Sequence, residues 1–217
     1  MYVEGRRVSV KRRSDGLRER PTRKNATSAS RRLPKAERRQ QLLDVARSIV
    51  RDEGTDALTL VSLAERADVT RPIAYEHFKT RPGLLIALAR NIDDRQVELF
   101  REALARTQPR LAEVARVASS AYMRCVTQVG REWHAITAAL QGDPEMDAVQ
   151  QELLERYAEI YCDVLAPCTK LPRRELKRRC VAIIGAAEAL AREMLLGQLE
   201  EEVAASTLRS LIVSWLG

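Results

Sequence analysis

The sequence predicts an all-α protein in which an N-terminal three-helix unit with a helix-turn-helix precedes a longer helical region. Aromatic residues make up 4% of the 217 residues and only nine are glycine, whereas helix-favouring alanine, leucine, arginine and glutamate are abundant. Apolar residues recur at helical spacing from about residue 35 onward. Between residues 59 and 81, two short helical patterns flank a tight turn.

The first 34 residues form a basic segment, with 11 Lys or Arg against three Asp or Glu, while the rest of the chain is nearly balanced in charge. The segment has no sustained apolar period, so we expect a disordered arm in the free protein. It is either a solvated leader or an arm that follows the phosphate backbone or enters an adjacent minor groove. A basic tail beside a helix-turn-helix favours nucleic acid as the partner.

A first helix is predicted from Lys35 to about Asp52, starting after Pro34 and stopped by Gly54. Its apolar positions form one stripe: Leu42, Val45, Ala46, Ile49 and Val50. We expect this helix to pack across the helix-turn-helix.

The helix-turn-helix begins with a helix whose apolar face consists of Leu60, Leu63, Ala64 and Ala67. Thr59 is placed to cap it. Asp68 tolerates the left-handed conformation of a tight turn. Thr70 or Arg71 then caps the second helix, and Pro72 fits its first turn because its missing N–H would have no helical partner there.

This segment resembles the DNA-binding end of TetR-type transcriptional regulators, whose pattern runs roughly T-T-x-x-x-I/L-A-x-x-A-G-V-S-x-x-x-L-Y-x-H-F-x-x-K. The matching positions are Thr59, Leu63, Ala64, Ala67, Val69, Thr70 (for serine), Tyr75, His77, Phe78 and Arg81 (for lysine). Leu60 replaces the second threonine, which removes a phosphate contact, Asp68 replaces the turn glycine, and Ala74 replaces the leucine.

Together with the resemblance, these patterns predict four segments: a basic arm at 1–34, a helix-turn-helix DNA-binding domain at 35–81, a connecting helix at 82–108, and a ligand-binding and dimerisation domain at 109–217. The resemblance also implies a ligand-responsive regulator, a repressor that binds a palindromic DNA operator as a homodimer and is released by a small molecule. Two alternatives stay open: a constitutive DNA-binding protein without an effector, and an enzyme with a DNA-binding head.

The candidate DNA contacts all lie in or beside the helix-turn-helix: Thr59, Ser62, Thr70, Arg71, Pro72, Ile73, Tyr75, His77, Lys79 and Arg81. Arg71 is the candidate for base readout because a guanidinium can bind guanine O6 and N7 together. Tyr75 and Lys79 suit phosphate oxygens. His77, beside Phe78, is equally well explained as a packing residue.

After Pro82-Gly83, a long helix is predicted through Leu104. Further helices are expected at about 110–130, 132–141, 144–166, 172–198 and 201–216, with Gly130 as one of the breaks. The last two carry apolar stripes: Cys180, Ile183, Ile184, Ala187, Leu190, Ala191, Met194 and Leu195 on one, and Val203, Leu208, Leu211, Ile212 and Trp215 on the other. The resemblance implies that 172–198 and 201–216 form a four-helix dimer interface; the alternative is that these stripes fill a monomer core.

A small-molecule pocket is predicted in the second half because aromatic and polarizable side chains concentrate there. The candidates are Tyr122, Met123, Trp133, His134, Tyr157 and Tyr161, with Glu188 as an acid at the pocket wall.

Other functional classes find little support. The chain has two histidines, no serine elbow and no glycine-rich phosphate loop, so we expect no enzyme activity and no cofactor. Its four cysteines lack paired zinc-site spacing, so we expect no metal and free thiols. The N-terminus lacks the apolar stretch of a secretory signal, and no apolar run approaches the roughly 20 residues of a membrane span. We therefore expect a cytoplasmic protein.

Overall fold

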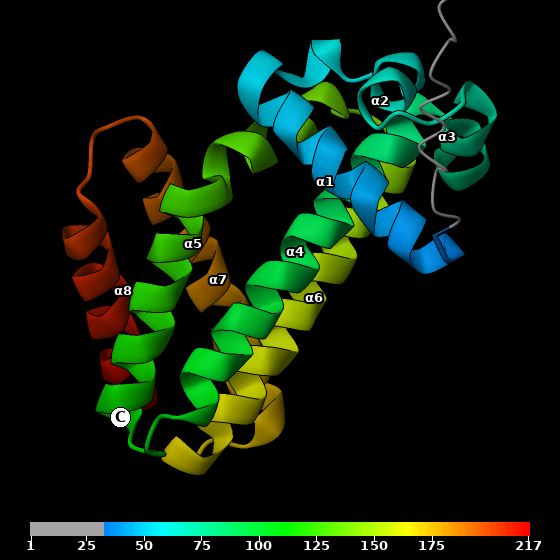
Figure 1. Cartoon of the computed structure of the whole chain (residues 1–217). Coiled ribbons are helices and arrows are strands. Elements are labelled where there is room, and N and C mark those ends of the chain that lie inside the picture. Colours follow the sequence, from blue (N-terminus) through cyan, green and yellow to red (C-terminus); the bar gives the residue numbers. More distant parts are fainter. Residues whose placement is uncertain (1–32) are drawn as a thin grey trace, which may run out of the picture. The chain divides into compact units, whose positions relative to one another are not determined.

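The computed structural model describes residues 33–217, and every regular element in that range is helical, which confirms the predicted fold class (Figure 1). Residues 1–32 of the predicted basic arm lie outside the described residues. The elements are α1 (Lys35–Glu53), η1 (Thr55–Ala57), α2 (Leu60–Arg66), α3 (Arg71–Phe78), α4 (Arg81–Ala105), α5 (Leu111–Ala139), α6 (Pro144–Leu165), η2 (Ala166–Cys168), α7 (Arg173–Leu195) and α8 (Glu201–Leu216).

The ends of the first helices follow the sequence signals. Gly54 terminates α1 at φ +86°, a conformation that favours glycine. Thr59 caps α2 by accepting the N–H of Ser62, and the Ser62 hydroxyl accepts the Thr59 N–H in return, so both ends of a capping box are present. Asp68 takes φ +51° in the turn before α3, as predicted for the position of the family's glycine.

The long helix α4 starts against the end of α3. Thr80 caps α4 by accepting the N–H of Gly83 at 3.1 Å. A Cβ at residue 83 would lie 2.5 Å from the Phe78 carbonyl oxygen, so this junction requires glycine. From there α4 runs the length of the helical body beside α6 (Figure 1). One continuous element thus connects the helix-turn-helix with the remaining helices.

The buried apolar side chains form two clusters. The first joins α1, α2, α3 and the start of α4 to the end of α5 and the start of α6, and includes Leu42, Ala74, Leu84, Ile136 and Met146. The second joins the rest of α4, α5 and α6 to α7 and α8, and includes Val97, Ala118, Tyr161, Ile183 and Leu208. The helix-turn-helix therefore shares its core with the ends of two later helices.

The predicted helix break at Gly130 is wrong, because α5 continues from Leu111 to Ala139. A Cβ at residue 130 would lie 3.1 Å from Leu195 Cδ2, so the missing side chain lets α7 pack closely on α5. A helical glycine costs about 1 kcal/mol relative to alanine, and packing along the helix outweighs this cost. Gly197, in contrast, lies beyond the end of α7 at φ +72°, as the predicted break there requires.

The apolar residues of α7 and α8 are partly buried in the core and partly exposed to solvent. Most of the predicted stripe lies in the second cluster, with buried members Cys180, Ile183, Ile184, Ala187, Leu208 and Ile212. Two members of the predicted α8 stripe, Val203 and Trp215, are exposed instead, as are five residues outside the predicted stripes: Val181, Ala182, Gly185, Ala189 and Leu196. We call these seven residues the α7/α8 outer face.

Candidate nucleic-acid interface and adjoining pocket

Helix α3 shows two contrasting faces. Ala74 and Phe78, four residues apart, are 0% and 4% exposed and anchor the helix on the first cluster. Arg71, Tyr75 and Lys79 follow the same four-residue spacing on the solvent side and are exposed. Pro72 and Thr70 are exposed as well. The eight-residue helix thus presents a guanidinium and a phenol outward, and Lys79, directly after its last residue, adds an ammonium.

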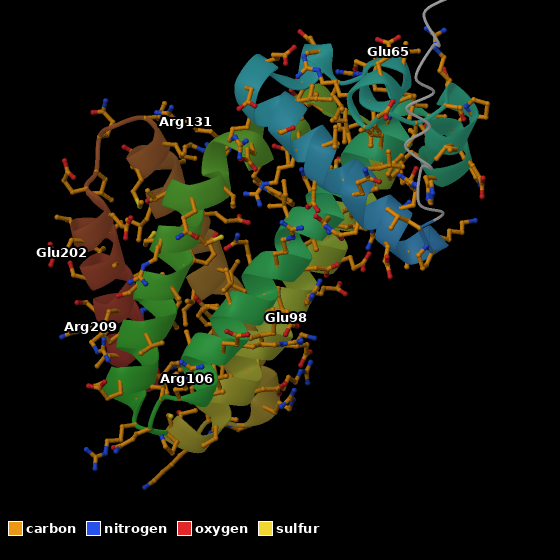
Figure 2. All side chains as sticks on the ribbon, viewed as in Figure 1. Glu65, Glu98, Arg106, Arg131, Glu202 and Arg209 are labelled. Atoms are coloured by element: carbon orange, nitrogen blue, oxygen red, sulfur yellow. The ribbon has the colours of Figure 1, made fainter. Side chains whose placement is uncertain are left out.

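Among residues 33–217, Arg71 forms an ion pair with Glu65. Its Nη2 atom lies 3.3 Å from Glu65 Oε1, and both side chains are more than 60% exposed. Glu65 stands at the outer edge of the helix-turn-helix (Figure 2). An exposed pair of this kind contributes little to stability, so the guanidinium can exchange Glu65 for another acceptor at low cost.

Four of the predicted contact residues also hold the interface in shape. Ser62 donates its hydroxyl to the Ala57 carbonyl at 2.7 Å, in addition to the capping box with Thr59. Arg81 donates to the carbonyls of Leu58 at 3.0 Å and Thr55 at 2.7 Å, which ties the start of α4 to the segment before α2. Ile73 is half-buried and packs on the first cluster.

His77 is half-buried beside Phe78, with ring centroids 6.0 Å apart. Burial lowers the pKa of its imidazole, with Glu76 acting in the opposite direction and Arg39 in the same direction, so the neutral form of the ring is favoured. Arg39 of α1 donates to the His77 carbonyl at 2.9 Å and lies 4.8 Å above the Phe78 ring. Arg39, which we did not predict, therefore fixes the C-terminal end of α3.

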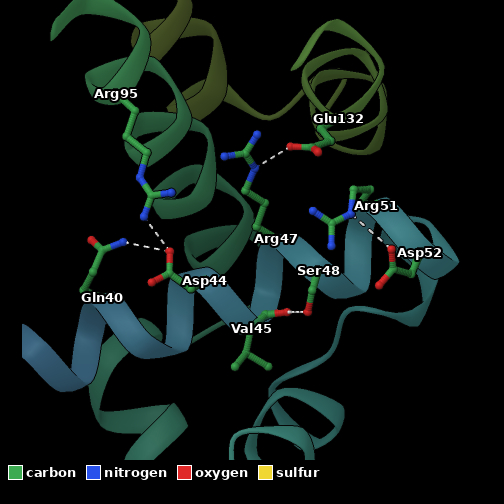
Figure 3. Close-up of polar contacts among 9 residues, drawn as sticks. All are labelled: Gln40, Asp44, Val45, Arg47, Ser48, Arg51, Asp52, Arg95 and Glu132. Carbon is green, nitrogen blue, oxygen red and sulfur yellow. Dashed lines mark hydrogen bonds and ion pairs between the residues drawn. The ribbon is translucent and has the colours of Figure 1, made fainter. Parts of the chain in front are cut away.

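Helix α1 is tied to the rest of the protein by ion pairs on its other side (Figure 3). Arg47 Nε donates to Glu132 of α5 at 2.7 Å, and these side chains are only 23% and 9% exposed. Asp44 accepts from Arg95 of α4 at 2.5 Å. The helix that supports the helix-turn-helix is therefore bonded to both α4 and α5.

A pocket of about 660 Å³ lies among α4, α5, α6 and α7. Five of the seven predicted ligand-binding residues line it: Tyr122, Trp133, His134, Tyr157 and Glu188. Met123 and Tyr161 do not line it, because both are fully buried in the second cluster, where Tyr161 stacks on Phe100 with centroids 5.4 Å apart. Burial raises the pKa of both Tyr122 and Tyr157, so their hydroxyls stay neutral.

Asp93 is a pocket residue that we did not predict. It is 6% exposed and lines the pocket from α4. Burial raises the pKa of its carboxyl to about 6, while Arg156, which donates to it at 3.0 Å, acts in the opposite direction. The signal in the sequence was an acid four residues from both Ala89 and Val97, within the apolar stripe of α4.

The pocket also lies where the two apolar clusters meet. Ile92, Trp133 and Leu153 line it from the first cluster, and Phe100 and Ile184 line it from the second. Trp133 is the direct chain neighbour of Glu132, the partner of Arg47. The wall of the pocket and the anchor of α1 are therefore adjacent on α5.

Comparison with known proteins agrees with this architecture. The family described as "Bacterial regulatory proteins, tetR family" matches residues 42–88. The HTH-type transcriptional regulator BetI of Paraburkholderia phymatum is 30% identical over 146 residues, which cover 66% of this chain and 71% of BetI. The chain belongs to the TetR family. Like the relatives it matches, this TetR-family protein is a transcriptional regulator with a helix-turn-helix DNA-binding domain.

Two further relatives of this TetR-family protein differ in how much they cover. The HTH-type transcriptional activator FasR of Mycolicibacterium smegmatis is 38% identical over 76 residues, but these span only 35% of either chain. The crystal structure of a TetR-like transcriptional regulator from Rhodococcus sp. RHA1 covers 84% of this chain and 97% of its own, at 26% identity and a TM-score of 0.61. The fold similarity thus extends well beyond the DNA-binding end.

Within residues 33–217, no helix combines the length and the apolar character that crossing a membrane requires. In the same range, no group of three or more His, Cys, Asp or Glu side chains is arranged to hold a metal ion. All four cysteines are free thiols.

Proposed function

We propose that this protein is a homodimeric repressor that binds a near-palindromic DNA operator through α3 and is released by a small molecule in the α4–α7 pocket. In this assignment residues 35–81 bind DNA, 82–108 connect, and 109–217 hold the effector and the partner subunit. The observation that carries the proposal is the outward face of α3, where Arg71 and Tyr75 are exposed, with exposed Lys79 at the helix end, while Ala74 and Phe78 anchor the helix.

The side chains of α3 suit different parts of the duplex. Arg71, at the N-terminal end, reads a guanine in the major groove, where Pro72 and Ile73 contact a thymine methyl. Tyr75 and Lys79 bind phosphate oxygens, and Thr59 and Thr70 at the two helix N-termini add further phosphate contacts. Arg71 releases Glu65 when it meets the base, an exchange that costs little between exposed groups.

Dimerisation through α7 and α8 uses the α7/α8 outer face. Small residues predominate along α7, and a Cβ at Gly185 would meet nothing within 4 Å, so a partner helix can approach closely. On α8, four exposed hydroxyls bond to carbonyls of their own helix and need no external partner: Ser206, Thr207, Ser210 and Ser214. Val181, Leu196, Val203 and Trp215 supply large apolar surface, each more than 40% exposed.

Two helices, α4 and α5, connect the effector pocket with the DNA-binding end. Helix α4 contributes Ile92 and Asp93 to the pocket and Leu84 and Leu85 to the core of the helix-turn-helix. Helix α5 contributes Trp133 to the pocket and Glu132 to the ion pair with Arg47 of α1. A ligand that favours one arrangement of these helices changes the spacing of the two copies of α3 and so weakens operator binding.

Genomic footprinting with purified protein tests the proposal, followed by a screen for small molecules that release the recovered site. We expect a near-palindromic site whose half-sites lie one helical turn, or a multiple, apart. A reporter placed behind that site is expected to be silenced; increased transcription would make the protein an activator. Uniform protection of all sequences, or a specific site that no molecule releases, would contradict the proposal.

The dimer is tested by placing a charge on the α7/α8 outer face. Ala189→Glu is expected to give monomers in analytical ultracentrifugation and to lose operator binding. Gln151→Glu, which adds the same charge on an exposed position of α6, is the control and should leave the dimer intact. A dimer that tolerates Ala189→Glu would place the interface elsewhere.

A further inference from the structure

We propose that the α4–α7 pocket selects a cationic ligand, an apolar or aromatic molecule carrying a protonated amine, and that Asp93 is the residue that binds the amine. This inference rests on the proposed effector pocket but names the chemistry that the pocket takes. It starts from the position of Asp93, which lines the pocket and is 6% exposed. A buried charge acts through a low dielectric and is little screened by salt, so it dominates ligand selection.

The ion pair of Asp93 leaves its charge incompletely balanced. The same Arg156 nitrogen, Nη1, donates to Asp93 Oδ2 at 3.0 Å and to Asp94 Oδ1 at 2.7 Å. One guanidinium therefore serves two carboxylates, and Arg90, the next cation, is bonded to Glu152 at 2.9 Å. Two cations face three carboxylates in this cluster, and Asp93 is the member that faces the pocket.

The surroundings of Asp93 suit an organic cation rather than a hydrated ion. The phenol of Tyr157 favours the charged form of the Asp93 carboxyl and so acts to lower its pKa, and the Tyr157 ring lies beside Phe100, with ring centroids 6.3 Å apart. Tyr122 and Trp133 line the pocket from α5. Aromatic faces attract organic cations, most strongly when water is excluded. The carboxylate and the rings thus favour the same kind of ligand.

The arginines that line the pocket are exposed to solvent. Arg124 of α5 and Arg192 of α7 line the pocket, but both are exposed. Arg192 is four residues from Glu188, whose carboxyl it stabilises in the charged form against partial burial. Solvent screens these charges, so they weigh less on a bound ligand than Asp93 does. His134 is exposed as well.

Three probes with one aromatic body separate charge from shape: 1-naphthylmethylamine, 1-naphthylmethanol and 1-naphthoic acid. In calorimetric titrations of the full-length protein at pH 7.5, we expect the amine to bind tightest and the acid weakest. Asp93→Asn should weaken the amine by about 10- to 100-fold, the range for a lost hydrogen bond to a charged group, and leave the alcohol unchanged. Glu98→Gln, which removes a charge from an exposed position of α4 outside the pocket, should keep the preference.

The pH dependence of amine binding to the wild-type protein tests the proposal without any substitution, so the test does not depend on whether a variant folds. The amine stays protonated across the acidic range, so its affinity for the wild-type protein should fall below about pH 6, where Asp93 takes up a proton. An amine that binds no tighter than the alcohol, or a preference that survives Asp93→Asn, would overturn the proposal. None of these titrations uses DNA, so failure of operator binding or of ligand-induced release is recognised separately.

Discussion

The DNA-binding end and the pocket region of this protein reach their shapes by different means. Around α2 and α3, several of the shaping contacts are local: a capping box at Thr59, a left-handed turn at Asp68 and a glycine junction at residue 83. Around the pocket, the decisive contacts join residues far apart in the chain, such as Asp93 with Arg156. The first region is shaped by its caps and turns, whereas the second is a set of helices packed around a cavity.

The two regions also handle buried charge differently. Glu132 and Arg47 pair one to one in a closed contact between α5 and α1. Asp93 instead shares its arginine with Asp94 and faces a cavity. A balanced pair suits a structural anchor, whereas an underbalanced carboxylate suits a site that receives a ligand.

The largest expected effect comes from breaking the balanced pair. Arg47→Ala leaves Glu132 buried without its partner and should destabilise the protein by about 3 kcal/mol. Arg51→Ala removes an exposed pair with Asp52 on the same helix and should cost less than about 1 kcal/mol. Urea unfolding of both variants checks the difference, and equal losses would show that the α1–α5 contact is no anchor.

The underbalanced carboxylate should appear in the pH dependence of stability. Asp94 of α4, Cys125 of α5 and Arg156, Tyr157 and Glu152 of α6 surround Asp93, while Glu188 and Arg192 line the pocket from α7. Burial raises the pKa of Asp93 from 3.8 to about 6, so protonation of this group favours the folded state. Its stabilising contribution is present below about pH 4 and is lost as pH rises through about 6.

The wild-type protein should therefore lose about 2 kcal/mol relative to Asp93→Asn between pH 4 and pH 7, since each unit of pKa shift corresponds to about 1.4 kcal/mol and part of the shift already lies below pH 4. Chemical unfolding of both proteins at several pH values measures this difference. Parallel pH profiles for the two proteins would mean that folding does not raise the pKa of the Asp93 carboxyl.

The contrast between the regions explains what the sequence could predict. Caps, turn residues and apolar stripes act within a few residues, so the fold class, the ends of α1 and α2 and the bounds of α8 followed from the sequence. The break predicted at Gly130 failed because contact with Leu195 of α7, invisible in the sequence, keeps that glycine within a helix. The roles of Asp93 and Glu132 were not predicted for a similar reason. Their ion-pair partners, Arg156 and Arg47, lie on other helices.

A third test concerns the glycine junction between α3 and α4. Gly83→Ala places a Cβ 2.5 Å from the Phe78 carbonyl oxygen and should cost about 1–3 kcal/mol, with weaker DNA binding because the end of α3 is displaced. Gly130→Ala is a useful comparison, since its Cβ would meet flexible side chains and not a carbonyl. If Gly83→Ala is as stable as the wild-type protein, α3 is held less rigidly than its contacts indicate.

The central assignment, that α3 reads sequence with Arg71 and binds phosphate with Lys79, is tested most directly by fluorescence anisotropy with the recovered operator and a scrambled duplex. Arg71→Ala should lose about 1–3 kcal/mol on the operator alone and relax the preference at one position per half-site. Lys79→Ala should weaken both duplexes alike and reduce the salt dependence of binding. Identical behaviour of the two variants, or operator binding unaffected by either, would contradict this assignment.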